Sequence, residues 1–133
     1  MSHPQRALVV DDNALNSRLV AVFLKRLGWT AQLVDNGDDA LALLARETFE
    51  LVLLDLRMPH VGGVEVCRRI RGGLGLRALP VIAYTAHSTP EERQRMIDVG
   101  FSGLLVKPLS FFDLRELCAE FGSPSGAADP KVA

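Results

Sequence analysis

The 133-residue sequence has no long apolar run, little cysteine and no excess of charge of either sign. A membrane span needs roughly 18 consecutive apolar residues, and the opening residues, MSHPQRALVV, lack the apolar core and cleavage pattern of a signal peptide. The formal net charge is -1, which gives no support for generic binding to nucleic acid or to a membrane surface. We therefore expect a cytoplasmic protein with no membrane insertion and no direct nucleic-acid binding.

The two cysteines, Cys67 and Cys118, fall within apolar helical patterns. We expect buried small hydrophobic side chains there, not a disulfide or a metal pair. The chain length and an apolar fraction of 48% fit one folded domain. From Gly122 onward the sequence GSPSGAADPKVA has too few large apolar side chains to pack. The expected organisation is a domain over residues 1–121 and a flexible tail over 122–133.

Short apolar runs alternate with longer segments of helical spacing, a pattern typical of parallel strands joined by crossover helices. Runs such as LVLL and LVV are apolar throughout, as expected for strands covered by helices on both faces. The expected strands are residues 6–10, 30–34, 50–54, 80–84 and 103–106. The expected helices are residues 14–27, 38–46 and 64–71, a fourth from the capping box at Thr89 to before Gly100, and a fifth opened by Ser110 and Asp113. The predicted fold class is α/β, with a doubly wound five-stranded parallel sheet.

Within the first expected helix, five apolar residues recur at helical spacing: Leu15, Leu19, Val22, Phe23 and Leu27. Burial of such a stripe against the sheet accounts for it without a ligand, because each large apolar side chain removed from water contributes roughly 1.5–3 kcal/mol. Glycines in the segment RGGLGLRALP after the third helix favour a flexible return loop.

Polar residues follow four of the expected strands. Asp11 and Asp12 follow the first strand, Asp55 the third, Thr85 the fourth and Lys107 the fifth. Each alone has an ordinary structural explanation, such as a helix cap, a turn or a solvated lysine. Parallel strands, however, bring their carboxyl ends to one edge of the sheet. Three carboxylates, a hydroxyl and an ammonium group are therefore expected in one crevice.

Concentrating carboxylates in this way opposes folding, because unit charges about 4 Å apart repel by about 4 kcal/mol at an effective dielectric of 20. A cation would relieve the repulsion. Carboxylate oxygens select Mg²⁺, Ca²⁺ or Mn²⁺, and a site with few protein ligands plus water and phosphate suits Mg²⁺. One carboxylate could then attack phosphorus, with the metal and Lys107 neutralising phosphoryl charge and Thr85 donating a hydrogen bond. The predicted chemistry is acyl-phosphate formation on an aspartate.

Four motifs carry these residues: VVDDN (9–13), LLDLRMP (53–59), YTAH (84–87) and LVKP (105–108). In this order and spacing the chain resembles the response-regulator receiver domains of two-component signalling, from about residue 6 to residue 121. The resemblance implies a flavodoxin-like strand order 2-1-3-4-5. It also implies that Asp55 accepts the phosphoryl group and that Thr85 and Lys107 contact it, with a cis bond between Lys107 and Pro108. The implied Mg²⁺ ligands are Asp12 and Asp55, supported by Asp11, and the backbone carbonyl of Arg57.

The sequences of two motif regions, VVDDNALNSRLV and YTAHSTPEER, are most similar to those of receivers in hybrid histidine kinases or phosphorelays. The resemblance implies a signalling protein that catalyses only its own phosphorylation and dephosphorylation. The implied phosphodonor is a histidine kinase or a histidine phosphotransfer protein. The implied output is a downstream protein that reads the face formed by the fourth helix, fifth strand and fifth helix.

Two positions depart from the family pattern. Leu104 stands three residues before the lysine, where many receivers have an aromatic residue, and Gly62 stands where an aspartate is common. By analogy with the family, Arg57 and His87 flank the phosphoryl group and tune its lifetime. His60 and His87 could also form a metal pair or carry a phosphoryl group, but we expect both to be merely solvated.

Three other functions fit parts of this pattern less well. A haloacid-dehalogenase-like phosphatase also uses an aspartate nucleophile, but it would need a second acid where Arg57 stands, and a cap domain. Dinucleotide binding would need a glycine-rich turn after the first strand, where the sequence has Asp11-Asp12-Asn13. A receiver-like module that works without phosphorylation is favoured by Leu104, although the intact acidic residues, threonine and lysine argue against it.

Overall fold

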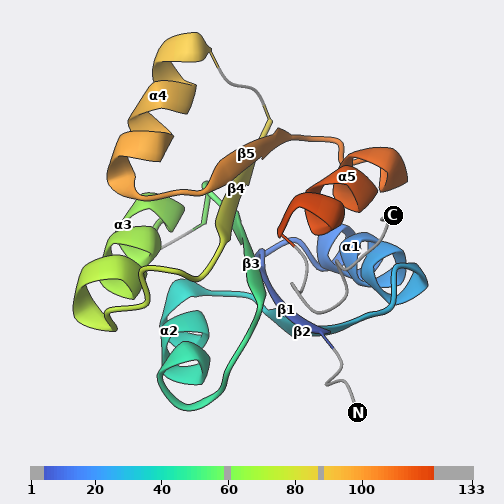
Figure 1. Cartoon of the computed structure of the whole chain (residues 1–133), viewed down its shortest axis with the longest axis horizontal. Coiled ribbons are helices and arrows are strands. Elements are labelled where there is room, and N and C mark those ends of the chain that lie inside the picture. Colours follow the sequence, from blue (N-terminus) through green and yellow to red (C-terminus); the bar gives the residue numbers. More distant parts are fainter. Residues whose placement is uncertain (1–4, 59–60, 87–88, 122–133) are drawn as a thin grey trace.

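The computed structural model describes residues 5–58, 61–86 and 89–121, and within them parallel strands alternate with α-helices (Figure 1). The strands are β1 Gln5–Val10, β2 Trp29–Val34, β3 Leu51–Asp55, β4 Val81–Thr85 and β5 Gly103–Val106. The helices are α1 Ala14–Arg26, α2 Gly37–Arg46, α3 Gly63–Arg68, α4 Pro90–Val99 and α5 Phe111–Phe121. The strands pair in the order β2-β1-β3-β4-β5, all parallel. The predicted fold class and strand order are confirmed.

The sheet lies between two layers of helices, with α1 and α5 on one face and α2, α3 and α4 on the other (Figure 1). Side chains along the central strands alternate between the two layers. Val9 and Leu53 pack toward α1 and α5, whereas Val10 and Leu54 pack toward α2, α3 and α4. All five residues of β3 are buried, which explains why its sequence is apolar without alternation.

Helix ends follow the signals read from the sequence. The side chain of Asn13 caps α1 by accepting a hydrogen bond from the amide of Asn16 at 3.1 Å. Thr89 and Glu92 form the predicted capping box at the start of α4. Gly100 ends that helix with a φ of 127°, a conformation that favours glycine.

The expected burial of the apolar stripe on α1 is wrong for three residues. Leu15, Leu19 and Val22 are 76%, 46% and 54% exposed. The helix instead packs Val20 and Leu24 against the sheet. Both stripes have helical spacing, so periodicity alone could not tell which faces the core.

The third helix also differs from expectation. Its α-helical part stops at Arg68, and the chain continues as a π-helical turn, Arg69–Gly73, through the first two glycines of the expected flexible loop. The Arg71 guanidinium holds this loop by donating to the carbonyl oxygens of Leu76, Leu79 and Gly100 at 2.6–2.9 Å. The return segment is therefore tied to the rest of the domain.

Two smaller expectations are confirmed. Cys67 and Cys118 are buried free thiols, and the bond between Lys107 and Pro108 is cis. No α-helix in the described ranges has the length and apolar character needed to cross a membrane. The expected tail, residues 122–133, lies outside the described residues.

Candidate functional site

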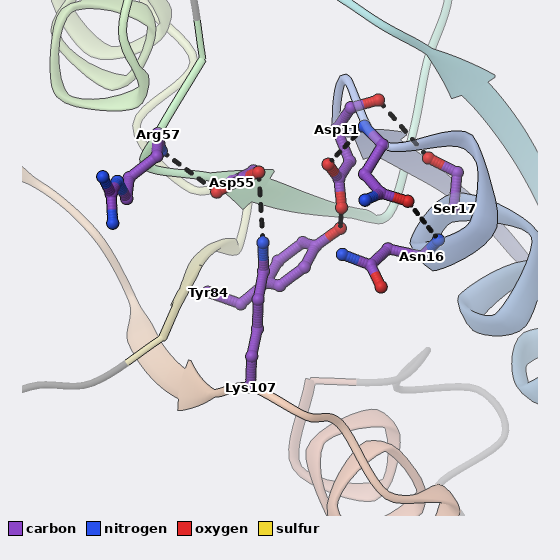
Figure 2. Close-up of polar contacts among 8 residues, drawn as sticks. Asp11, Asn16, Ser17, Asp55, Arg57, Tyr84 and Lys107 are labelled. Atoms are coloured by element: carbon purple, nitrogen blue, oxygen red, sulfur yellow. Dashed lines mark hydrogen bonds and ion pairs between the residues drawn. The ribbon is translucent and has the colours of Figure 1, made fainter.

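Five of the predicted site residues lie at the carboxyl edge of the sheet. Asp11 and Asp12 follow β1 directly, Asp55 and Thr85 are the last residues of β3 and β4, and Lys107 follows β5. Register brings these ends level, because Asp55 is paired with Tyr84, and Thr85 with Val106. Figure 2 shows Asp55 between Arg57 and Asp11, with the ammonium group of Lys107 below its carboxylate.

The carboxylates of Asp11, Asp12 and Asp55 form a cluster in which one oxygen from each lies within 4.8 Å of the others. Asp11 and Asp55 are only 2% and 3% exposed, whereas Asp12 is exposed. Buried carboxylates at this distance repel strongly unless a cation lies near them. Hard oxygen donors with one ligand open to water suit a magnesium ion that keeps part of its hydration shell. The donor set fits the predicted metal.

The Asp55 carboxylate is held from two sides. The backbone amide of Arg57 donates to Oδ1 at 3.0 Å, and Lys107 Nζ lies 3.2 Å from Oδ2. Burial raises the pKa of Asp55 above its ordinary value, and the neighbouring Asp11 raises it further, while the Arg57 amide and Lys107 lower it. The net direction is upward, so the charge of Asp55 is incompletely balanced by its protein neighbours.

Asp11 is held just as firmly, partly by a residue that the sequence reading missed. The amide of Asn13 donates to Oδ1 at 2.9 Å, and the hydroxyl of Tyr84 donates to Oδ2. The hydroxyl of Ser17 donates to the main-chain oxygen of Asp11 at 3.4 Å. Burial, followed by contact with Asp11, raises the pKa of the Tyr84 phenol far above its usual range. Tyr84 stands inside an apolar strand next to Thr85, where an aromatic residue is easily read as core alone.

Thr85 and Arg57 are less closely joined to the cluster. Thr85 is buried, and its main-chain oxygen accepts from the Lys107 amide at 2.7 Å. Among the described residues, its hydroxyl makes no hydrogen bond to Asp55 or Lys107. The side chain of Arg57 is exposed, and only its backbone reaches Asp55. His60 and His87 lie outside the described residues.

The acidic cluster opens into a surface depression of about 380 Å³ between α1 and the end of β2. Asp11 and Asp12 line it together with Arg18, Asp35 and Asp39. A cation can therefore reach Asp11 and Asp12 from solvent without passing through the apolar core.

The family model for the response regulator receiver domain matches residues 7–119, and the chain belongs to this family. It is therefore a receiver domain of two-component systems, a family of phosphoacceptors. The sensor histidine kinase RcsC of Salmonella typhi is 39% identical over 114 residues, which are 86% of this chain and 12% of RcsC. The chain thus spans about an eighth of the length of that relative.

Solved receivers share the fold. The chemotaxis protein CheY4 of Vibrio cholerae has a TM-score of 0.84 and 26% identity, covering 90% of this chain and 99% of CheY4. The receiver domain of sensor histidine kinase PA1611 from Pseudomonas aeruginosa has a TM-score of 0.80 and 30% identity, covering 91% of this chain and all of that domain. That domain has a magnesium ion coordinated in its active-site cleft.

Proposed function

We propose that this chain accepts a phosphoryl group on Asp55 from the phosphohistidine of a histidine kinase or histidine phosphotransfer protein, in a reaction that requires Mg²⁺. The observation that carries the proposal is the placement of the Asp55 carboxylate, which has oxygens of Asp11 and Asp12 within 4.8 Å and the ammonium group of Lys107 at 3.2 Å. Similarity to RcsC supports the kind of phosphodonor. The magnesium ion of the PA1611 receiver supports the choice of metal.

Asp12 and Asp55 would hold the metal directly, with support from Asp11 and the main-chain carbonyl of Arg57. The bound cation would supply positive charge to the phosphoryl oxygens. The protein contributes an already assembled set of oxygen ligands whose repulsion the cation relieves. Because Asp12 is exposed, it offers the accessible ligand through which an ion could enter.

In the proposed transfer, an Asp55 oxygen attacks phosphorus in line, forming a P–O bond as the donor's P–N bond breaks. The imidazole nitrogen leaves with the electron pair of that bond. The Arg57 amide fixes the orientation of the carboxylate. Lys107 Nζ, already 3.2 Å from Asp55, can then pair with the phosphoryl oxygens, and the hydroxyl of Thr85 donates to the same group. The only reactions catalysed are phosphorylation and dephosphorylation of the chain itself.

The proposed output surface is the face formed by α4, β5 and α5. Each element presents one large exposed apolar side chain, namely Ile97, Val106 and Phe112. Such side chains suit contact with a protein partner. Phosphorylation would shift a two-state equilibrium of the segment carrying Thr85, and a downstream protein would read the change at this face.

The assignment of Asp55 is tested by incubating the protein with acetyl phosphate and Mg²⁺ and measuring incorporated phosphate by intact mass. One acid-stable, base-labile phosphate is expected, and Asp55→Asn should take up none. Asp38→Asn is the matched control, because Asp38 is an exposed aspartate on α2, and it should label as the wild type does. Equal labelling of Asp55→Asn would rule out the assignment.

A further inference from the structure

Tyr84 is the single tyrosine of the chain, and it lies beside Asp55 without being part of the predicted site. Its side chain is 1% exposed and joins the core cluster between the sheet and the layer of α1 and α5. Figure 2 shows the ring between Asp11 and Lys107, with its hydroxyl directed at the Asp11 carboxylate. Tyr84 therefore touches two neighbours of Asp55.

Packing alone does not explain a tyrosine at this position. A phenylalanine would fill almost the same volume without burying a hydroxyl. A buried hydroxyl costs about 1–3 kcal/mol unless it finds a hydrogen-bond partner. The partner here is a buried carboxylate of the acidic cluster, Asp11 Oδ2, and hydrogen bonds to charged groups are stronger than those between neutral groups.

The Tyr84 hydroxyl supplies the second of two hydrogen bonds to the Asp11 carboxylate. The amide of Asn13 holds Oδ1 at 2.9 Å, and Tyr84 holds Oδ2, so rotation of the carboxylate about its last bond would break both hydrogen bonds. Each carboxylate oxygen has lone pairs on two sides. Asp11 can therefore keep both bonds and still face a cation or its water.

The face of the same ring is next to the phosphoryl-binding lysine. Lys107 Nζ lies 4.9 Å from the ring centroid, a distance at which an ammonium group is attracted to the ring face. A phenylalanine would keep most of this contact and lose only the hydrogen bond to Asp11. The two roles of the residue can thus be separated by one substitution.

We propose that Tyr84 is a positioning residue for the metal site, which acts by orienting Asp11 through its hydroxyl. The proposal rests on the Mg²⁺ binding inferred under the proposed function. Groups that orient metal ligands typically change metal affinity by about 10–100-fold when they are removed. Since Asp11 supports the metal alongside Asp12 and Asp55, we expect Tyr84→Phe to weaken Mg²⁺ binding by about tenfold.

The test compares Mg²⁺ titrations of the wild type, Tyr84→Phe and Ser17→Ala, followed by calorimetry. Ser17→Ala is the matched control, because it also removes one buried hydroxyl near Asp11, but one that donates to the main chain and not to the carboxylate. It should bind Mg²⁺ within about twofold of the wild type. Melting curves of the metal-free proteins verify that each variant is folded.

A second measurement reports on the hydrogen bond in the wild-type protein itself. A cation near Asp11 draws electron density from its carboxylate and weakens the bond from the phenol, so the tyrosine absorption band should shift to shorter wavelength as Mg²⁺ binds. The single tryptophan, Trp29, is 5% exposed and begins β2 at the opposite edge of the sheet. Tyr84→Phe, which has no tyrosine, supplies the baseline spectrum.

Labelling by acetyl phosphate separates positioning from general damage. The rate for Tyr84→Phe should be about tenfold below that of the wild type at limiting Mg²⁺ and should approach the wild-type rate at saturating Mg²⁺. A variant impaired only in packing would stay slow at both concentrations, which would overturn the proposal.

The remaining outcomes are also decisive. A wild type that binds Mg²⁺, together with a Tyr84→Phe variant of equal affinity, would overturn the role of Tyr84 and leave the metal site standing. A Mg²⁺-binding wild type whose tyrosine band does not move would also count against that role. A wild type that shows no heat of binding and no change in melting with Mg²⁺ would overturn the metal site and this proposal with it.

Discussion

Neutralising Asp55 should stabilise the metal-free protein while destroying its proposed function. The replacement Asp55→Asn keeps the size of the side chain and leaves an oxygen that can accept from the Arg57 amide, whose bond to Asp55 is 3.0 Å long. It removes a buried negative charge from a cluster in which another buried carboxylate, that of Asp11, has an oxygen within 4.8 Å. A gain in stability is expected from this loss of charge, because the proposed metal site concentrates buried negative charge.

The expected gain is the balance of three effects: burial of the Asp55 charge, its repulsion from Asp11 and its attraction to Lys107. Two unit charges 4.8 Å apart repel by about 3.5 kcal/mol at an effective dielectric of 20, which applies to Asp11 and Asp55. Lys107 at 3.2 Å offsets this repulsion, but its side chain is 25% exposed, so water screens the attraction. Burial is the largest influence on the pKa of Asp55, and the net direction is upward. We therefore expect Asp55→Asn to add about 1–2 kcal/mol to the unfolding free energy without metal.

The upward shift of the Asp55 pKa also determines how the stability of the protein depends on pH. Because the folded-state pKa of Asp55 is raised above its ordinary value of 3.8, protonation of Asp55 favours the folded state. This contribution is fully present below the ordinary pKa and is lost as pH rises through the folded-state pKa. The advantage of Asp55→Asn should accordingly be largest at neutral pH and should fade as the medium is acidified toward the ordinary value.

Urea unfolding with a chelator at several pH values measures the difference in unfolding free energy between Asp55→Asn and the wild type. The expected gain corresponds to a rise of roughly 3 to 8 °C in melting temperature. Mg²⁺ at about a hundred times its dissociation constant should stabilise the wild type by about 2.7 kcal/mol and should stabilise Asp55→Asn much less. The exposed control Asp38→Asn should change stability by at most about 0.5 kcal/mol. A metal-free Asp55→Asn protein that is less stable than the wild type at neutral pH would refute the reasoning.

Three further predictions concern residues around the site and in the core. Gly63→Ala should cost about 1–3 kcal/mol in urea unfolding and slow labelling by acetyl phosphate, because a Cβ there would lie 2.7 Å from the main-chain oxygen of Asp55. Gly72→Ala, whose Cβ would meet nothing within 4 Å, is the control and should be nearly neutral. Arg71→Met should cost about 3 kcal/mol or more by chemical denaturation, since it leaves three carbonyl groups without their donor; an unchanged midpoint would contradict this. Burial raises the pKa of Cys118 to about 12, so its alkylation at pH 8 should be roughly a thousandfold slower than that of a free thiol, and rapid modification of the native protein, read by peptide mass, would argue against its burial.

The sheet was predictable from the sequence because its signals are local and redundant. Apolar strands of four to six residues, separated by capped helices, leave few alternatives to a parallel sheet. The orientation of α1 was not predictable in the same way. Val22 and Val20 lie on different faces of one helix, and only contact with the sheet and α5 decides that Val20 is buried. A surface apolar stripe and a core stripe have the same period.

The candidate site shows a similar division. Asp11, Asp55 and Lys107 were predictable because each lies at or directly after the end of a strand, and strand ends converge by topology. Tyr84 was not, because its importance depends on side-chain direction across the sheet. The strand order makes the strands of Tyr84 and Asp55 neighbours, but their register and the reach of the Tyr84 hydroxyl to Asp11 are three-dimensional facts.

The same register bears on how a receiver with a leucine at position 104 could transmit phosphorylation. Leu104 is half-buried against the core cluster on the side of α2, α3 and α4, and it is not aromatic. Tyr84 is aromatic, but it is buried and hydrogen-bonded to Asp11, so it is not free to turn outward. The backbone offers a shorter connection. Thr85 is paired with Val106, and its carbonyl accepts from the Lys107 amide at 2.7 Å. A shift of Thr85 toward a phosphoryl group would therefore pull on β5 itself and displace Val106, which is 40% exposed on the proposed output face. Such coupling needs a strand that moves as a unit, and the unbroken parallel ladder between β4 and β5 provides one.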